Sequence, residues 1–163
     1  MPAPYQPLAF ANEFILKSEG AGVDHMKLQK LVYCAYGWWL AAHREPIMTE
    51  GPEVWRHGPV FSSLYSALAG NGARPITTPQ SAAFGKEPPR IDDGDEEACN
   101  LVDFVWHRYG AFSGFKLSEM THKKGTPWQI TAKRNNYRVP RHLKIEDDLI
   151  RGEFSQLANE AIA

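Results

Sequence analysis

The longest amphipathic pattern of the chain lies in its first third. Apolar residues return there at three- and four-residue intervals, the spacing of a buried helix face; they are Leu28, Leu31, Val32, Ala35, Trp38, Trp39 and Ala42. Asp24 is a suitable N-cap, and Pro46 disfavours helical geometry at the residue before it. We therefore expect one long helix, with Lys27, Lys30 and Arg44 outside its buried stripe. A helix that is rich in aromatic residues and carries no catalytic group indicates an interaction scaffold.

Six shorter amphipathic stretches predict further helices. Most of them are bounded by residues that cap helices or by glycine. The stretches run from Leu8 to Lys17, from Pro59 to Gly70, from Asp92/Asp93 to Gly110, from Ser113 to Met120, from Thr126 onward and from Leu149 to Ala161. Thr126 and Gln129 have the spacing of a capping box, with Pro127 at the first helical position. The pattern therefore predicts a predominantly helical protein.

Two regions lack helical periodicity. Residues 47–56 predict a short extended pair that turns at residues 50–52, and residues 73–92 predict a proline-rich loop with room for a small hairpin. The predicted fold class is mostly α: a single compact helical domain with a small β-hairpin or short antiparallel sheet. We assign residues 1–7 to a flexible N-terminal tail and residues 8–163 to the domain.

Composition and charge narrow the class of protein. With 163 residues, 43% of them hydrophobic and 23% charged, the chain has the size and composition of one soluble domain. Its formal net charge of -1 predicts no general attraction to nucleic acid or membranes, and no apolar run is long enough to span a bilayer. The first residues lack a secretory signal pattern. Cys34 and Cys99 lack metal-site spacing, so we expect free thiols and a cytoplasmic location.

Positive charge is concentrated between residues 116 and 144, which we call the basic segment. Its only acidic residue is Glu119, and its basic residues are Lys116, Lys123, Lys124, Lys133, Arg134, Arg138, Arg141 and Lys144. Three interpretations are open: a solvated face balanced by acidic residues elsewhere, a contact for an acidic protein partner, or a contact for DNA. Complementary charge accelerates association between proteins. No helix-turn-helix signature accompanies the segment, so DNA binding has the least support.

Five tryptophans are more than the core of a domain of this size ordinarily needs. Trp38, Trp55 and Trp128 are expected to lie in the core. Trp39 follows Trp38 directly and cannot easily share its packing direction. A partner surface is therefore an equal alternative for Trp39, because tryptophan buries a large area at little entropic cost.

The histidines and cysteines follow no recognisable catalytic or metal-binding pattern. The sequence has no H-E-x-x-H, C-x-x-C or G-x-S-x-G motif. His57 and His122 are expected to be partly buried, with their ring nitrogens hydrogen-bonded. A hydrolase built on Ser118, His122 and His57 is kept as an alternative. The prediction itself is a non-enzymatic protein that needs no cofactor and no metal.

Four short motifs follow one another along the chain. They are Lys27-Leu28-Gln29-Lys30-Leu31 with Gly37-Trp38, Val54-Trp55-Arg56-His57-Gly58-Pro59-Val60, Leu117-Ser118 with Thr121-His122, and Pro127-Trp128. In this order they resemble the SocA-like family, the phage-associated GepA-type proteins that carry the Panacea antitoxin domain. The similarity extends to residues 11–14 and to Ile150 and Phe154, so it covers nearly the whole chain.

The resemblance implies an antitoxin that binds and neutralises a protein toxin encoded by an adjacent gene. Within the family it also implies a proteolytic adaptor that delivers the toxin to ClpX of the ClpXP protease. The candidate partner-binding residues are Trp39, Lys123, Lys124, Arg138 and Arg141. Structural roles are expected for Lys27, Gln29, Leu31, Trp55, His57, Gly58, Pro59, His122, Pro127 and Trp128. The main alternative is a DNA-binding transcriptional regulator that uses the basic segment, and the hydrolase has less support.

Overall fold

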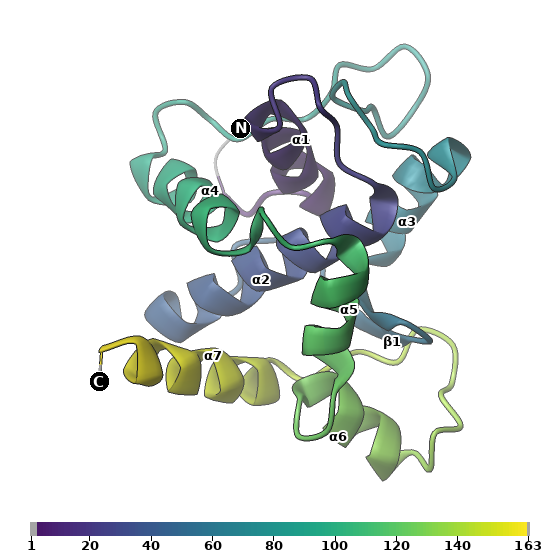
Figure 1. Cartoon of the computed structure of the whole chain (residues 1–163), viewed down its shortest axis with the longest axis vertical. Coiled ribbons are helices and arrows are strands. Elements are labelled where there is room, and N and C mark those ends of the chain that lie inside the picture. The colour runs from purple at the N-terminus through teal and green to yellow at the C-terminus, as the bar shows by residue number, and fades with distance from the viewer. Residues whose placement is uncertain (1–2, 163) are drawn as a thin grey trace.

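Helix α2 (His25–His43) runs through the centre of the molecule, and the other elements surround it in the computed structural model (Figure 1). The structure describes residues 3–162. Four elements lie on one side of α2: α1 (Pro7–Lys17), α3 (Ser62–Leu68), the 3-10 turn η1 (Ala69–Asn71) and α4 (Glu96–Tyr109). On the other side lie α6 (Pro127–Arg134) and α7 (Asp147–Ile162). Helix α5 (Gly114–His122) lies between the two sides. β1 (Glu53–Trp55) and β2 (Gly58–Val60) pair antiparallel. The predicted fold class, mostly α with a small antiparallel sheet, is confirmed.

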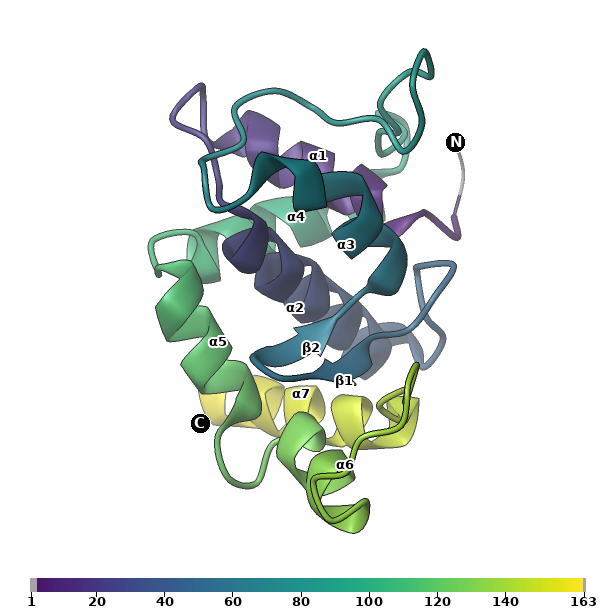
Figure 2. The ribbon, with the colours of Figure 1, turned by 90° about the vertical axis from the view of Figure 1, so that its right-hand side faces the viewer.

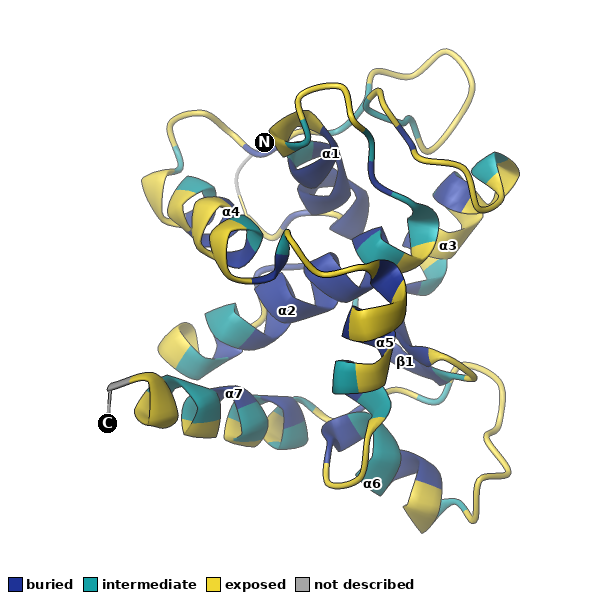
Figure 3. Cartoon of the chain, viewed as in Figure 1, coloured by how far each residue is buried: buried dark blue, intermediate teal, exposed yellow. Residues whose placement is uncertain are grey.

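Helix α2 is buried around most of its circumference rather than along one stripe. Asp24 caps it as predicted and accepts a hydrogen bond from the Lys27 N–H at 3.0 Å. Every residue from Leu28 to Gly37 is buried, because α1, α4, α5, α7 and the hairpin all pack against this helix (Figure 3). The expectation that Lys30 lies outside the buried face is therefore wrong. This residue is 2% exposed.

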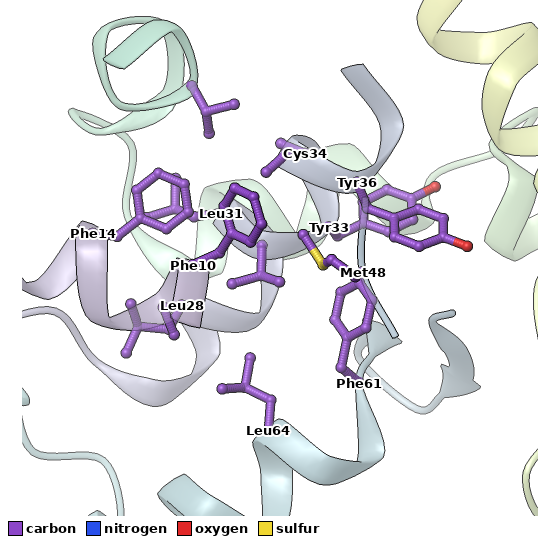
Figure 4. Packing of buried hydrophobic residues seen from close by; sticks show 14 of the residues in the cluster. Phe10, Phe14, Leu28, Leu31, Tyr33, Cys34, Tyr36, Met48, Phe61 and Leu64 are labelled. Carbon is purple, nitrogen blue, oxygen red and sulfur yellow. The ribbon is translucent and has the colours of Figure 1, made fainter. Parts of the chain in front are cut away.

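Part of the hydrophobic core lies where α1 and α3 pack against α2. Phe10 and Phe14 of α1 lie beside Leu28 and Leu31 of α2, and Leu64 of α3 completes the cluster (Figure 4). All five side chains are fully buried. Burying each of them stabilises the fold by roughly 1.5–3 kcal/mol. The predicted core position of Leu31 is confirmed.

On its other side, α2 approaches α7 closely. A Cβ atom added to Gly37 would lie 2.1 Å from Cε2 of Phe154, so glycine is needed at this crossing. The Phe154 ring is 1% exposed and packs edge-on against Tyr33 and Trp38, with centroid separations of 5.8 Å and 5.7 Å. The close crossing fixes α7 to the central helix.

The hairpin lies further along the chain than predicted. We expected strands within residues 47–56 and helix from Pro59, but the pairing is Val54 with Pro59 and Trp55 with Gly58. The turn falls at residues 56–57, and Gly58 follows it with φ of +118°, which favours glycine. Pro59 therefore lies in β2, where a two-stranded sheet tolerates its missing N–H. Helix α3 begins three residues later, at Ser62.

The N-terminal segment is packed where it is described. We assigned residues 1–7 to a flexible tail, of which residues 1–2 lie outside the described part. Tyr5 is 2% exposed, and its backbone N–H donates to the Ile47 carbonyl at 2.8 Å. Its hydroxyl donates to Asp95 Oδ2 at 2.8 Å, and Pro7 already belongs to α1. For Tyr5 to Pro7 the expectation of a flexible tail is corrected.

The structure confirms some of the predicted helix caps and loops and corrects others. Ser113 and Thr126 accept bonds from the backbone N–H groups three residues later, as predicted, although Gln129 Oε1 accepts from the Gly125 N–H rather than from that of Thr126. Asp95, rather than Asp92 or Asp93, caps α4. Residues 73–92 form no hairpin; within them, Ile76 makes an isolated bridge to Val23. The two capping differences concern only the first residues of α4 and α6.

Candidate functional site

The four motifs meet where the β1–β2 hairpin is held between α2, α5 and α6 (Figure 2). Lys30 Nζ donates to the Pro59 carbonyl at 3.0 Å, and Trp128 Nε1 donates to the Trp55 carbonyl at 2.7 Å. The Ser118 hydroxyl donates to the carbonyl oxygen of His57. Three different elements therefore hold the hairpin through its backbone carbonyls.

Gln29 fixes the chain as it leaves the hairpin. Its Oε1 accepts from the Phe61 N–H at 2.9 Å, and its Nε2 donates to the Phe61 carbonyl at 3.4 Å. Lys27 Nζ donates to the carbonyl of Gly110 at the end of α4. A buried backbone group without a partner costs about 1–3 kcal/mol, so these side chains hold the loops in place.

Lys30 is the most deeply buried cation among the described residues. Burial lowers the pKa of its ammonium group to about 8, because a charge is poorly solvated in the protein interior. A Cβ on Gly58 would lie 2.8 Å from Lys30 Cε, so the lysine side chain passes directly beneath the hairpin turn.

Ser118, His122 and His57 lie close together. The polar groups of Ser118 and His122 contact backbone carbonyls rather than forming a nucleophile–base pair. The Ser118 Oγ to His122 Nδ1 separation is 3.5 Å, while the Ser118 proton is directed to the His57 carbonyl. His122 Nδ1 contacts the Ser118 carbonyl, and its ring packs edge-on against Trp128 with centroids 5.4 Å apart. The imidazole of His57 is exposed and takes no part in this contact. In this geometry the Ser118 proton goes to a backbone carbonyl rather than to His122.

Among residues 3–162, no cluster of three histidine, cysteine, aspartate or glutamate side chains is placed to hold a metal ion. None of the helices within that range combines the length and apolarity needed to cross a bilayer.

Trp39 lines an open groove between the C-terminal half of α2, α4 and α7. We call it the Trp39 groove; its volume is about 640 Å³. Its main apolar lining residues are Trp38, Trp39, Ala42, Leu101, Phe104 and Ala158. The Trp39 ring stacks on His43 at 3.6 Å between centroids, and His43 Nε2 lies 2.8 Å from Glu97 Oε2 on α4. Trp39 is therefore partly exposed and held in a defined orientation.

The other predicted core tryptophans are only partly buried. Trp38 donates through Nε1 to the Tyr109 hydroxyl at 2.9 Å and packs edge-on against Phe104. Trp38 and Trp128 pack against the core, whereas the partly buried Trp55 lies beside Tyr65. The expectation of core positions is met only in part, because the domain is too small to enclose rings of this size completely.

The four candidate basic residues are exposed but do not lie in one place along the fold. Lys123 and Lys124 occupy the α5–α6 connection, whereas Arg138 and Arg141 lie in the loop that follows α6. None of the four takes part in an ion pair with a described residue, while Lys116 in the same segment pairs with Glu119 at 3.3 Å. The four charges are thus available to a partner.

The walls of the Trp39 groove that α4 and α7 form were not predicted from the sequence. Phe104 is 44% exposed and lies off the apolar stripe of α4 that Ala98, Leu101 and Val105 define. A large apolar residue outside a buried stripe is the signal that could have found it. The contribution of α7, through Ser155 and neighbouring residues, depends on how the last helix packs and has no comparable local signal.

Comparison with known proteins agrees with the motifs. The family described as "Antitoxin SocA-like, Panacea domain" matches residues 28–129. Antitoxin SocA of Caulobacter vibrioides (strain NA1000 / CB15N) is 27% identical over 142 residues, which cover 81% of this chain and 72% of that protein. No solved structure matches the chain. Trp39, Lys123 and Lys124 lie inside the family match, whereas Arg138 and Arg141 lie beyond it.

Proposed function

Because the chain belongs to the antitoxin SocA-like family with its Panacea domain, we propose that it binds a protein toxin encoded by an adjacent gene and neutralises it by that contact. The family supports the antitoxin role. The direct contact with a toxin is our proposal. A cytoplasmic location of this chain is also our proposal. The protein needs no catalytic step for this role.

The Trp39 groove is the observation that supports a protein contact most strongly. It exposes part of Trp39 and 44% of Phe104 on adjacent helices. Exposed aromatic clusters of this kind serve as interface anchors, because rigid rings bury a large area without much loss of side-chain entropy. We propose that the toxin covers this groove.

The basic segment would act at an earlier stage of binding. Lys123, Lys124, Arg138 and Arg141 are exposed and unpaired within the described part of the chain. Exposed charges of one sign accelerate the approach of an oppositely charged partner more than they strengthen the final complex. An acidic surface on the toxin is therefore part of the proposal.

We also propose, as a separable role, that the protein carries the toxin to ClpX of the ClpXP protease. This role rests on the family alone. It is tested by measuring toxin degradation in a reconstituted Clp protease reaction with and without the antitoxin. Equal degradation rates would remove the adaptor role and leave neutralisation intact.

The toxin contact is tested by co-purification of the chain with the product of each adjacent gene. We expect one of these products to form a stable complex, and Trp39→Leu to raise its dissociation rate at least tenfold. Phe84→Leu is a matched control, since Phe84 is fully exposed in the 73–92 loop, outside the groove. The absence of a complex with every neighbouring product would overturn the proposal.

A further inference from the structure

A second cavity, of about 470 Å³, opens between the first half of α2, the β1–β2 hairpin and α3. We call it the Trp55 pocket. The lining residues that matter here are His25, Lys30, Trp55, Arg56, His57 and Tyr65. None of the described residues that line this pocket also lines the Trp39 groove. Its volume lies in the range of roughly 300–1,000 Å³ that is typical of small-molecule sites.

Aromatic rings form the walls of the pocket. The Trp55 and Tyr65 centroids are 4.8 Å apart at an interplanar angle of 43°, and the His25 ring lies 5.1 Å from that of Tyr65. Trp55 Nε1 donates to Glu53 Oε1 at 3.1 Å, which orients the indole. Tyr65 is nevertheless 43% exposed. Rings that are oriented but partly open suit a planar ligand, because aromatic groups pack favourably against one another.

The charge of the lining is unbalanced towards the positive. Lys30 and Arg56 are cationic, and two histidines accompany them. Asp24 is the acidic residue of the described lining, and its Oδ1 already accepts the Lys27 N–H at the start of α2. The pocket therefore favours a ligand that carries negative charge.

Lys30 strengthens this preference. Its Nζ donates to the Pro59 carbonyl, the acceptor that the structure gives it among the described residues, although an ammonium group has three N–H donors. Among the described residues, Lys30 forms no ion pair with a carboxylate within 4.0 Å. A neutral donor would make the same bond without the cost of burying a charge. Burial accordingly lowers the pKa of Lys30 to about 8, and a nearby anion would relieve that cost.

We propose that the Trp55 pocket binds a small planar anion, a ring that carries a phosphate or carboxylate group. The ring packs against Trp55 and Tyr65, and the anion lies on the side of Lys30 and Arg56. A nucleoside monophosphate and an aromatic carboxylate share this chemistry. This binding is independent of the toxin contact, so the purified chain alone is sufficient to test it.

The test is isothermal titration of the purified chain at pH 7 with AMP, adenosine, inorganic phosphate and benzoate. AMP or benzoate should bind with a Kd below about 1 mM. Adenosine and phosphate, which each present only one half of the ligand, should bind at least tenfold more weakly than AMP. If benzoate binds and AMP does not, the anion is a carboxylate; the reverse result identifies a phosphate.

Variants then locate the site. Lys30→Met should weaken binding at least tenfold by removing the buried charge, and Tyr65→Ala should do so by removing one wall. Tyr65 is partly exposed, so its variant keeps the proposal testable if Lys30→Met unfolds. Lys116→Met on α5, outside both the pocket and the groove, is the matched control that should bind like the parent.

Either of two results would overturn the proposal. One is a Kd above about 1 mM for both AMP and benzoate. The other is unchanged binding in folded Lys30→Met and Tyr65→Ala variants. The titration results do not depend on whether the chain binds a toxin. If no small ligand binds, the proposed antitoxin role still stands.

Discussion

At the scale of single residues, the buried Lys30 and the partly buried Glu153 couple the stability of the protein to pH in different ways. Burial lowers the pKa of Lys30 to about 8. Burial raises the pKa of Glu153 on α7 to about 7, an effect that the charge of Lys123 partly offsets. In both cases the charged form is the one that the interior disfavours. Each residue therefore destabilises the fold where it is charged.

Removing the Lys30 charge should change how stability depends on pH. Between about pH 8 and the ordinary lysine pKa of 10.5, the unfolded chain binds more protons than the folded one, so the unfolding free energy of the parent rises with pH. Lys30→Met lacks this rise. Urea denaturation at pH 7.5 and 9.5 should show the parent gaining about 2 kcal/mol relative to the variant. Parallel changes in the two proteins would mean that Lys30 is not buried as a cation.

For Glu153→Gln, the change in stability relative to the parent should depend on pH in the opposite sense to that for Lys30→Met. The raised pKa means that the folded protein binds more protons than the unfolded chain between pH 4.5 and about 7, so the parent loses stability as pH rises through this window. Above it, the glutamine variant should be more stable than the parent by about 1–3 kcal/mol. Thermal melts at pH 5 and pH 8 measure this; an equal difference between the proteins at both values would contradict a buried carboxyl group.

At the scale of elements, the central position of α2 depends on how closely its neighbours approach. Gly37 lets α7 cross α2 with the Phe154 ring in contact, and Leu31 anchors the opposite face. Helix α2 thus joins the two halves of the fold. Its stability and that of α7 should be coupled.

A methyl group at the crossing tests that coupling. Gly37→Ala places Cβ 2.1 Å from the Phe154 ring, so the ring or α7 must move. We expect a loss of about 1–3 kcal/mol in the unfolding free energy, as for overpacked cores. Phe154→Leu should recover part of the loss in the double variant. Gly152→Ala, at an open position on α7, is the control and should not destabilise the fold.

Local patterns predicted the helices because their caps and periodicity are encoded nearby. Asp24, Ser113 and Thr126 cap helices as expected, since a cap needs only the next three residues. The hairpin was misplaced because Pro59 suits either a first helical turn or an edge strand, and contacts from Lys30 and Ser118 decide between them. Such contacts between distant segments also explain why the burial of Lys30 and the α7 wall of the Trp39 groove escaped prediction.

At the scale of the whole molecule, α7 connects the two proposed toxin contacts. Its C-terminal half contributes Ala158 to the Trp39 groove, and its Glu153 carboxyl lies within electrostatic reach of Lys123 in the basic segment. A partner that covers one contact could therefore extend to the other along α7. The groove would then supply lasting contact and the charges would supply rapid encounter.

Charge reversal separates these two contributions. Replacing Lys123, Lys124, Arg138 and Arg141 with glutamate should slow toxin association about tenfold or more at low salt, and reduce its salt dependence, while changing dissociation much less. Stopped-flow or surface-based kinetics measure both rates. Arg74→Glu with Lys86→Glu, exposed positions outside the segment, provides the control. A change confined to the dissociation rate would contradict a steering role.

Bacterial growth during co-expression measures neutralisation most directly. A product of an adjacent gene should arrest growth when expressed alone, and co-expression of this chain should restore growth. Trp39→Leu should lower that protection, while Phe84→Leu should protect like the parent. If no neighbouring product is toxic, or if the chain gives no protection against one that is, the protein does not neutralise a toxin encoded beside it.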